Sequence, residues 1–424
     1  MTTYFDTLPK DELEEVLSGL EHEADAIRKK NLHLDMTRGK PNSDQVKLSL
    51  GLFDTLDSDS DFVYEGQDCA NYGTPQGISE IRDLGAQLLG IDQDLVIASG
   101  SSSLNLMFDC VAAGFVQGIA NMPAQAYVQD RKWICLAPGY DRHFAITKYF
   151  GYENIAVKMD ETGPDMDTIE RLVQEDPSIK GIWCVPKYSN PTGITYTEKQ
   201  VMRFAHLKPA APDFRIYWDN AYCVHDLYAT PDELANIFDY LGPEQNLVYE
   251  FASTSKITVP GAGVGFVGAS QADIEIISQA LDTSRVCSDK CNQLAHIKFL
   301  QDLPHIYKHM EKQAELIRPK FEIVQKKLED GLAGFNCGRW TKPRGGYFIS
   351  FDGPLHSAGQ IVDLAASLGL NLTQAGSTWP DGFDPYDTNI RIAPTYPCEK
   401  DLELAMDIFV LSVKIVAARH AREK

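Results

Sequence analysis

Short apolar runs alternate with helical patterns along the chain from about residue 75. Apolar positions recur every three or four residues over Ile78–Leu89 and Leu104–Phe115, which predicts helices. The intervening runs are apolar at nearly every position, as is typical of strands covered on both faces. They span 95–98, 133–137, 155–158, 181–186, 215–218, 247–251 and 264–267. The alternation predicts an α/β fold in which helices flank a mostly parallel sheet.

A different pattern follows these runs. A long helical region is expected over Asp289–Gly331, with interruptions at Pro304 and Pro319. Apolar segments at 346–351 and 389–393 then alternate with helical patterns, which indicates a smaller α+β domain.

The helical patterns of this second region cover 360–368 and 399–420, and an N-terminal helix at 10–31 is expected to pack on them. We therefore predict a large domain over 50–315, and a small domain built from 1–49 and 316–424. In such an enzyme the site would lie in the cleft between the domains.

Composition and charge narrow the possible partners. The 424 residues include 39 Lys and Arg against 60 Asp and Glu, a formal net charge of −21. Such an acidic field repels phosphate backbones and anionic lipid, so we expect no nucleic acid and no membrane partner. No run approaches the roughly 20 apolar residues of a membrane span, and the N-terminus has no signal-peptide pattern.

The nine cysteines fit reduced thiols in the cytoplasm, because none falls in a CxxC pair and several lie in apolar runs. Cys287 and Cys291 could share a helix face. Two ligands without a nearby His or carboxylate cluster make a poor metal site, so no metal is expected.

Polar residues follow several of the predicted strands, where α/β sheets bind ligands. Asn190 begins an Asn-Pro-Thr-Gly turn after the run at 181–186, and a turn alone would explain it. Asp219 ends the run at 215–218 and needs a partner if it is buried; it could cap a helix or meet a protonated ring nitrogen. Tyr222 lies three residues further on and could reach the same ligand.

A lysine and several hydroxyl residues follow two further strands. Lys256 comes directly after Ser253, Thr254 and Ser255, and a lysine past a buried strand becomes a nucleophile when desolvation lowers its pKa. Gly100 and the serines after it open a helix, whose N–H groups can bind an anion, although a serine helix cap is the simpler explanation. Together these segments describe an aromatic phosphate aldehyde held by a lysine, which is pyridoxal 5'-phosphate.

The order of these motifs also resembles that of fold type I aminotransferases. The matching segments are Tyr72 to Gly77, Gly100-Ser-Ser, Pro138-Gly-Tyr140, Asn190-Pro-Thr-Gly193, Asp219-Asn-Ala-Tyr222, Ser253-Thr-Ser-Lys256 and Asn389-Ile-Arg391. The resemblance covers about residues 35–395. Thr37-Arg-Gly-Lys-Pro41 and the segment 255–263 look most like an atypical bacterial branch of aspartate aminotransferases.

The resemblance implies roles for the residues around the cofactor ring. Lys256 would form the Schiff base and move the proton, and Asp219 would keep the ring nitrogen protonated. Asn190 and Tyr222 would bind the phenolic oxygen, and Tyr140 would stack on the ring. Lys256, Asp219 and Tyr222 are thus the expected catalytic residues.

The resemblance also implies how the phosphate and the substrate are bound. The expected phosphate ligands are Ser101, Ser102, Ser253 and Ser255. Tyr72 matches a tyrosine that reaches the phosphate of the partner subunit, which implies a homodimer with shared active sites. Gly39 and Asn190 would adjoin the substrate, and Arg391 would bind its α-carboxylate in a bidentate manner.

One departure from the family pattern concerns the phosphate charge. An arginine normally follows the lysine by about eight residues, whereas this chain has Gly261-Ala-Gly-Val-Gly-Phe266 there. We hypothesise that Lys290, of the same or of the neighbouring subunit, replaces it as a cation at the phosphate or at the distal carboxylate of the substrate. A solvated lysine at a helix start is the alternative. Arg38, Lys40 and Arg285 are further candidates for the distal carboxylate.

The segment Gly263-Val-Gly-Phe-Val-Gly268 also satisfies the GxGxxG pattern of dinucleotide-binding proteins. These glycines lie late in the sheet, and Asp282, the only acidic residue at a plausible offset, closes a helix. We therefore favour the aminotransferase interpretation.

The expected reaction moves an amino group from an amino acid, with L-aspartate as the expected donor, to a 2-oxo acid, with 2-oxoglutarate as the expected acceptor. Alanine, aromatic amino acids and 2-aminoadipate stay open as donors. A lyase or decarboxylase using the same lysine is the second enzyme class, and a firm hold on the α-carboxylate by Arg391 argues against loss of that group. A transcriptional regulator would need an added basic DNA-binding domain.

Overall fold

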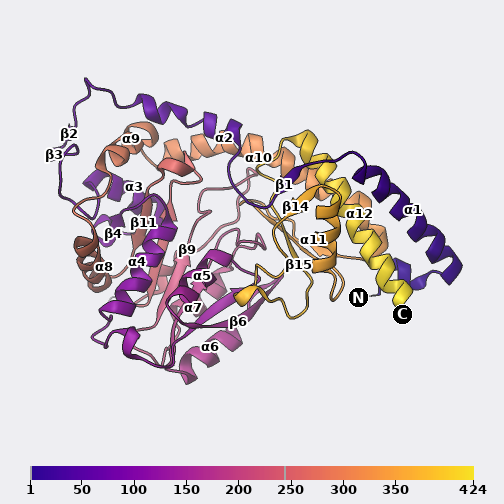
Figure 1. Ribbon diagram of the computed structural model, residues 1–424. Helices are drawn as coiled ribbons and strands as arrows, with labels where there is room; N and C mark the ends of the chain where they lie inside the picture. The colour runs from indigo at the N-terminus through magenta and orange to yellow at the C-terminus, as the bar shows by residue number, and fades with distance from the viewer. Residues whose placement is uncertain (1, 243–244) are drawn as a thin grey trace.

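An eight-stranded sheet forms the centre of the larger part of the molecule (Figure 1). The computed structural model describes residues 2–242 and 245–424. In spatial order the strands are β4 (Val96–Ala98), β11 (Gly265–Gly268), β10 (Val248–Ser253), β9 (Arg215–Asp219), β8 (Ile179–Cys184), β5 (Lys132–Ala137), β6 (Glu153–Asp160) and β7 (Gly163–Pro164). The five strands from β10 to β6 are parallel, whereas β11 and β7 run antiparallel to their neighbours. The predicted mostly parallel sheet is confirmed.

Side chains on both faces of this sheet are buried, which explains the continuous apolar runs. On β5, Ile134 belongs to a core cluster with residues of α6 and α7, while its neighbour Trp133 packs on the opposite face with residues of α4 and α8. The helices around the sheet are α3 (Ser79–Leu89), α4 (Ser103–Val116), α5 (Asp141–Tyr149), α6 (Met166–Glu175), α7 (Glu198–Ala205), α8 (Gln271–Ser284) and α9 (Lys290–Leu300).

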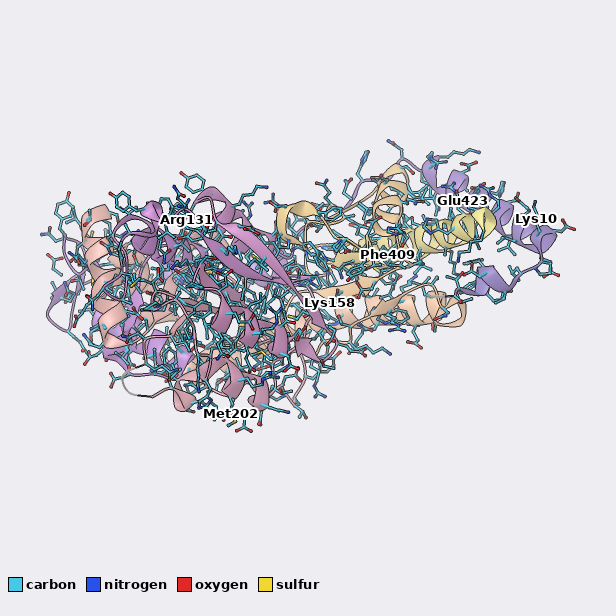
Figure 2. All side chains as sticks on the ribbon, turned by 90° about the horizontal axis from the view of Figure 1, so that it is seen from below. Lys10, Arg131, Lys158, Met202, Phe409 and Glu423 are labelled. Atoms are coloured by element: carbon cyan, nitrogen blue, oxygen red, sulfur yellow. The ribbon has the colours of Figure 1, made fainter. Side chains whose placement is uncertain are left out.

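A second, smaller sheet lies beside the C-terminal helices. It consists of the antiparallel strands β12 (Arg339–Trp340), β13 (Ile349–Asp352) and β15 (Asn389–Ile392), next to α11 (Ala358–Ser367) and α12 (Glu399–Glu423). The N-terminal segment joins this part of the molecule, because β1 (Leu34–Met36) pairs in parallel with β14 (Leu370–Leu372) and α1 (Lys10–Arg28) packs on α12. Lys10 and Glu423 lie at the same end of the molecule (Figure 2). The predicted smaller α+β unit is confirmed.

The helical region breaks just before Pro304, where α9 ends at Leu300 and the long helix α10 (Leu303–Leu332) begins, as predicted, whereas the interruption predicted at Pro319 is wrong. Pro304 lies in the first turn of α10, where no intrahelical N–H bond is lost, and Asp302 caps the helix by accepting from the His305 N–H at 2.9 Å. Pro319 lies inside the helix without ending it. Ile317 and Phe321 on either side are buried in the core shared with α12, and this packing offsets the cost of about 3 kcal/mol for an internal proline.

One core cluster joins the N-terminal segment to residues from 314 onward, with Val185, Tyr188, Tyr222 and Leu227 also packed into it, and three others lie within residues 69–310. This grouping supports the division at 50 and 315, which stays a prediction. The remaining short elements are α2 (Ser43–Lys47), β2 (Val63–Tyr64), β3 (Gln67–Asp68) and 3₁₀ turns at Tyr4–Thr7, Leu50–Asp54, Gln93–Leu95, Gln125–Tyr127, Ile237–Tyr240, Pro260–Ala262, Ala333–Phe335 and Pro380–Gly382. Among the described residues, none of the helices combines the length and the apolar character that crossing a bilayer requires.

Candidate active site

A buried carboxylate marks the carboxyl end of β9. Asp219 Oδ2 lies 3.1 Å from His143 Nε2 on α5, and the imidazole of His143 stacks on Trp183 with the ring centroids 4.6 Å apart. The second oxygen, Asp219 Oδ1, is buried and has no hydrogen-bond partner among the described residues. Because a buried carboxylate oxygen without a donor is costly, this atom indicates a ligand that supplies an N–H.

Lys256 follows β10 and faces the same space. Its Nζ lies 4.9 Å from the centre of the Tyr222 ring. Desolvation lowers the pKa of the Lys256 ammonium, although the nearby Asp219 charge opposes this shift. The lysine is thereby shifted toward the neutral amine that a nucleophile requires.

Two tyrosines complete this part of the cleft. Burial raises the pKa of the Tyr140 hydroxyl to about 12, with further contributions from Asp219 and Asp141. Burial likewise raises the pKa of Tyr222 well above its usual value, and Arg391 opposes that shift. The groups that affect one another's pKa values lie at or just after the ends of three different strands, or on β15. The fold therefore brings them within electrostatic range of one another.

Arg391 on β15 is buried and presents one edge of its guanidinium. Nη1 donates to Asn190 Oδ1 at 3.3 Å and lies 3.5 Å from Asp141 Oδ1, and Nη2 donates to the Thr373 hydroxyl at 3.3 Å. The Phe348 ring supports the guanidinium, with its centre 4.9 Å from Cζ. The buried Nε has no partner among the described residues. The edge formed by Nε and Nη2 can therefore bind a carboxylate through two parallel hydrogen bonds.

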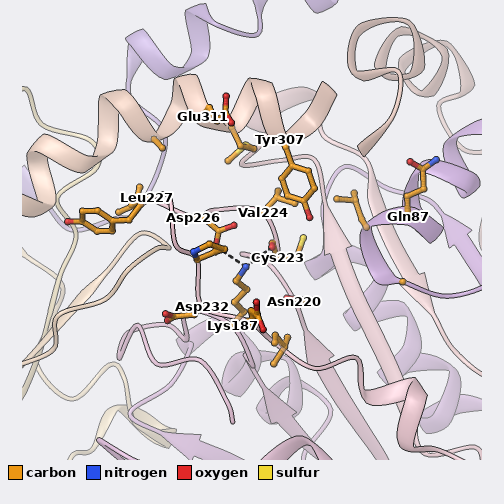
Figure 3. A pocket seen from close by; sticks show the side chains of 18 of the residues that line it. Gln87, Lys187, Asn220, Cys223, Val224, Asp226, Leu227, Asp232, Tyr307 and Glu311 are labelled. Atoms are coloured by element: carbon orange, nitrogen blue, oxygen red, sulfur yellow. Dashed lines mark hydrogen bonds and ion pairs between the residues drawn. The ribbon is translucent and has the colours of Figure 1, made fainter. Parts of the chain in front are cut away.

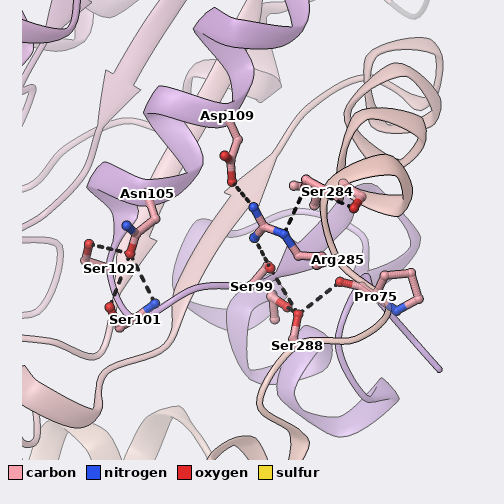
Figure 4. Close-up of polar contacts among 11 residues, drawn as sticks. Pro75, Ser99, Ser101, Ser102, Asn105, Asp109, Ser284, Arg285 and Ser288 are labelled. Carbon is pink, nitrogen blue, oxygen red and sulfur yellow. Dashed lines mark hydrogen bonds and ion pairs between the residues drawn. The ribbon is translucent and has the colours of Figure 1, made fainter. Parts of the chain in front are cut away.

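Ser101 and Ser102 form the loop between β4 and α4. Both hydroxyls donate to Asn105 Oδ1, at 3.2 and 3.1 Å (Figure 4). Ser102 is the N-cap of α4, yet its side chain makes no cap hydrogen bond, so the N–H groups of the first turn stay available to an anion. Ser255 joins the loop by donating to the Ser101 carbonyl at 2.8 Å, whereas Ser253 is the last residue of β10.

The glycines of the GxGxxG segment allow close packing around this loop. A Cβ at Gly263 would lie 2.5 Å from both the Ser101 carbonyl oxygen and Ser255 Oγ, and one at Gly265 would lie 2.6 Å from the Ser102 carbonyl oxygen. These glycines are thus explained by the approach of the chain to the Ser101–Ser102 loop. Val264, eight residues after Lys256 where the family arginine is expected, is buried.

The structure does not bring Lys290 into the cleft. Its side chain is 2% exposed, and Nζ donates to the carbonyls of Asp68 at 2.8 Å and Tyr72 at 3.1 Å. The ammonium uses two of its three N–H groups to hold the segment before α3, so Lys290 is not a solvated lysine, and a role for it at the phosphate or substrate of a neighbouring subunit stays a prediction. Tyr72, on the segment that Lys290 holds, is 77% exposed.

Arg285 lies one step behind the Ser101–Ser102 loop. It donates to Ser99 Oγ at 2.8 Å and to Asp109 Oδ2 at 2.6 Å, as Figure 4 shows.

The N-terminal segment lies near the Phe348 ring. A Cβ at Gly39 would clash with the Phe348 ring that supports Arg391, while Arg38 is exposed and Lys40 Nζ lies 3.8 Å from the centre of the Tyr396 ring.

Sequence reasoning missed four residues of this site. His143 lies one helical turn after Tyr140, and a histidine at that offset behind a buried strand is a signal that could have been read. Thr373, Phe348 and Asp141 contact Arg391 only because distant segments meet, and no local pattern marks them.

Comparison with known proteins identifies the family. The family model described as "Aspartate amino-transferase" matches residues 8–424. The chain belongs to this aspartate aminotransferase family. It is an aminotransferase, and enzymes of this fold type use pyridoxal phosphate.

Two relatives show how far the similarity of this aminotransferase extends. It is 42% identical to an aspartate aminotransferase of Corynebacterium glutamicum, over 93% of this chain and 92% of the other. It is also 45% identical to a protein of Mycolicibacterium smegmatis, with 90% of each chain covered. A crystal structure of an aspartate transaminase from Corynebacterium glutamicum superimposes with a TM-score of 0.95 at 39% identity, covering 98% of this chain and 99% of the other.

Proposed function

We propose that this aminotransferase uses pyridoxal 5'-phosphate to move the amino group of L-aspartate to 2-oxoglutarate. The observation that carries the proposal is the buried Asp219, whose Oδ1 has no donor among the described residues, while Lys256 and Arg391 lie within electrostatic range of the same site. The cofactor supplies an aldehyde that condenses with amines and a protonated ring that accepts electrons.

The residues present fit that group. Asp219 Oδ1 would accept from the ring N–H, and the resulting pairing of charges favours the protonated ring. His143 holds Oδ2 and so fixes the carboxylate in one orientation. Tyr140, Tyr222 and Asn190 are the candidates for contact with the ring face and its phenolic oxygen.

Lys256 would carry out the proton transfer. Desolvation favours its neutral amine, which can accept a proton from the substrate α-carbon and return it elsewhere. Arg391 would fix the α-carboxylate through Nε and Nη2, which orients that α-carbon and disfavours loss of the carboxylate. This arrangement favours transamination over decarboxylation.

The phosphate would lie at the N-terminus of α4, among Ser101, Ser102 and Ser255. Hydroxyls, backbone N–H groups and the positive end of the helix would offset its charge in place of the family arginine. Arg285 supports this loop from behind through Ser99. Ser253 stays a candidate ligand at the end of β10.

The choice of L-aspartate rests on the relatives that carry this name and on a cation near the cleft. A dicarboxylic donor needs a second positive group for its distal carboxylate. Lys290 and Arg285 are engaged elsewhere, and Lys40 lies on the Tyr396 ring. We therefore propose Arg38, which is exposed and adjoins Gly39 on the Phe348 ring.

The test is a panel of amino donors with 2-oxoglutarate and the purified protein. We expect aspartate to be used in preference to alanine, phenylalanine and 2-aminoadipate, with glutamate as a product. Arg38→Met should raise the KM for aspartate and leave that for alanine unchanged, whereas Arg339→Met, an exposed change on β12, should alter neither. Release of carbon dioxide from aspartate without formation of glutamate would contradict transamination.

We also propose that the enzyme is a cytoplasmic homodimer. All nine cysteines are free thiols, which fits a reducing compartment. Lys290 holds the segment that carries the exposed Tyr72, and a large apolar side chain presented in this way suits contact with a second subunit. Sedimentation of the purified enzyme and of Tyr72→Ser would test the dimer.

A further inference from the structure

A second cavity lies behind the loop that follows β9. Its volume is about 920 Å³, and it is bordered by the end of α3, the first half of α10 and residues 220–236 (Figure 3). Asp219 and Tyr222 are assigned to the catalytic cleft, whereas Asn220, Cys223 and Asp226 from the same loop line this cavity. The volume lies in the range of cavities that bind small molecules.

Two buried polar side chains on one side of the cavity lack a hydrogen-bond donor. Asn220 Nδ2 donates to Glu250 Oε1 at 3.0 Å. Glu250 Oε2 and Asn220 Oδ1 are both buried and have no partner among the described residues, and the two side chains belong to residues only 3% and 7% exposed. Both residues line the cavity, and no N–H group among the described residues reaches either of these two oxygens.

The charge of the lining indicates the sign of a ligand. Six carboxyl side chains line the cavity against two cationic ones. Lys187 is already neutralised, since its Nζ lies 2.8 Å from Asp226 Oδ1 and donates to the Cys223 carbonyl at 3.0 Å. Arg318 donates to the Leu227 carbonyl at 2.5 Å. Apart from the Lys187–Asp226 pair and from Glu250, whose pKa is raised to about 8, four carboxylates stand against the single charge of Arg318, and this excess favours a cation.

Apolar side chains separate the two acidic sides. In Figure 3, Asn220 lies on one side and Glu311 of α10 on the other, with Val224 and Cys223 between them. Leu227 and Met310 extend the apolar lining, and the Lys187–Asp226 ion pair also lies between the two sides. A ligand that spans the cavity thus suits a positive group at each end, joined by methylene groups that pass over the apolar side chains.

We propose that this cavity binds a linear di- or polyamine, with one ammonium donating to the Asn220–Glu250 pair and another facing Glu311. The described residues contain no group of three or more potential ligands that could hold a metal ion, which favours an organic cation over a metal. The methylene chain between the ammonium groups would cover Val224 and Met310.

The proposed binding should also change the protonation of Glu250, which can be measured. Burial raises the pKa of its carboxyl to about 8, although the hydrogen bond from Asn220 opposes this shift. The charged and titratable groups around the carboxyl are Cys223, the Lys187–Asp226 pair and, across the cavity on α10, Tyr307 and Glu311. An ammonium favours the ionised carboxylate, so binding should release a proton at pH 7 and tighten as the pH rises toward 8.

The test is isothermal titration of the purified holoenzyme with 1,5-diaminopentane at pH 7, in two buffers of different ionisation enthalpy. We expect saturable binding with release of close to one proton per chain. The monoamine 1-aminopentane should bind roughly tenfold more weakly or worse, because it lacks the second charge-assisted hydrogen bond.

Glu250→Gln keeps the oxygen that accepts from Asn220 and removes the charge, and it should weaken diamine binding roughly ten- to hundredfold and abolish the proton release. Glu12→Gln, an exposed change on α1, serves as the matched control. Thermal melting checks the fold, and Glu311→Gln on the surface of α10 provides a second variant whose folding is not at risk. No binding, equal binding of the monoamine, or diamine binding that persists unchanged in both variants would overturn the proposal.

Discussion

His143 Nε2 and Asp219 Oδ2 lie 3.1 Å apart, and both side chains are almost completely buried. The contact leaves Asp219 Oδ1 as the only oxygen of the carboxylate without a partner among the described residues. His143 therefore positions a carboxylate whose second oxygen is directed to the ligand. This pairing makes separate predictions for the two residues.

Asp219→Asn should keep the fold and much of the cofactor while losing most activity. A neutral amide cannot favour a protonated ring nitrogen, and electrostatic contributions of this kind are worth on the order of a thousandfold in rate. The measurement is kcat with aspartate and 2-oxoglutarate. Asp239→Asn, an exposed change, is the control, and near-normal turnover of Asp219→Asn would refute the role of Asp219.

His143→Asn should lower kcat/KM by roughly ten- to hundredfold, the range expected when a hydrogen bond to a charged group is lost. The loss should appear mainly in kcat, because His143 touches Asp219 and has no assigned contact with the substrate. His22→Asn on the exposed face of α1 controls for the substitution itself. A change confined to KM would place His143 in substrate binding instead.

Arg391→Lys should weaken every α-amino acid donor, whatever its side chain. A lysine keeps the charge but cannot form the two parallel bonds that Nε and Nη2 offer, so kcat/KM should fall roughly a hundredfold. Steady-state kinetics with aspartate and alanine measure this directly. Arg339→Lys on β12, an exposed position in the same small sheet, is the matched control, and a loss limited to aspartate would move Arg391 to the distal carboxylate.

Lys290→Met should lower stability and leave donor preference unchanged. The change removes the donor from the partly buried carbonyls of Asp68 and Tyr72, at a cost of about 1–3 kcal/mol in the free energy of unfolding. Denaturation curves of the variant and of Lys298→Met, an exposed change on the same helix, measure the difference. A variant of normal stability whose KM for aspartate has risen would restore Lys290 to the substrate site.

Much of the fold could be predicted because its signals are local. The runs over β5 and β8 are apolar at successive positions since both faces of the sheet are covered, and the turn and hydroxyl motifs lie directly after their strands. Asp219 and Lys256 could be singled out for the same reason, because each follows an apolar run closely in the sequence. The prediction of an interruption at Pro319 was wrong. The sequence shows the local cost of an internal proline, but it does not show that the packing of α10 against α12 offsets this cost.

The contacts of charged side chains could not be predicted in this way. Lys290, Arg285 and Arg391 each bind groups far away in the sequence, and nothing near them in the chain indicates the partner. The motif resemblance assigned both Arg391 and Asn190 to the substrate, and in the structure the two side chains are in contact, while their roles stay predictions. The resemblance gave no signal for the contacts that Lys290 makes, because its partners are backbone carbonyls, which every residue has.

The central claim is that Lys256 holds the cofactor. Treating the purified enzyme with borohydride fixes the cofactor to the lysine that binds it, and peptide mapping then identifies that residue. The account predicts a pyridoxyl group on Lys256 and loss of both the label and the visible absorbance in Lys256→Ala. A pyridoxyl group on any other lysine would contradict it.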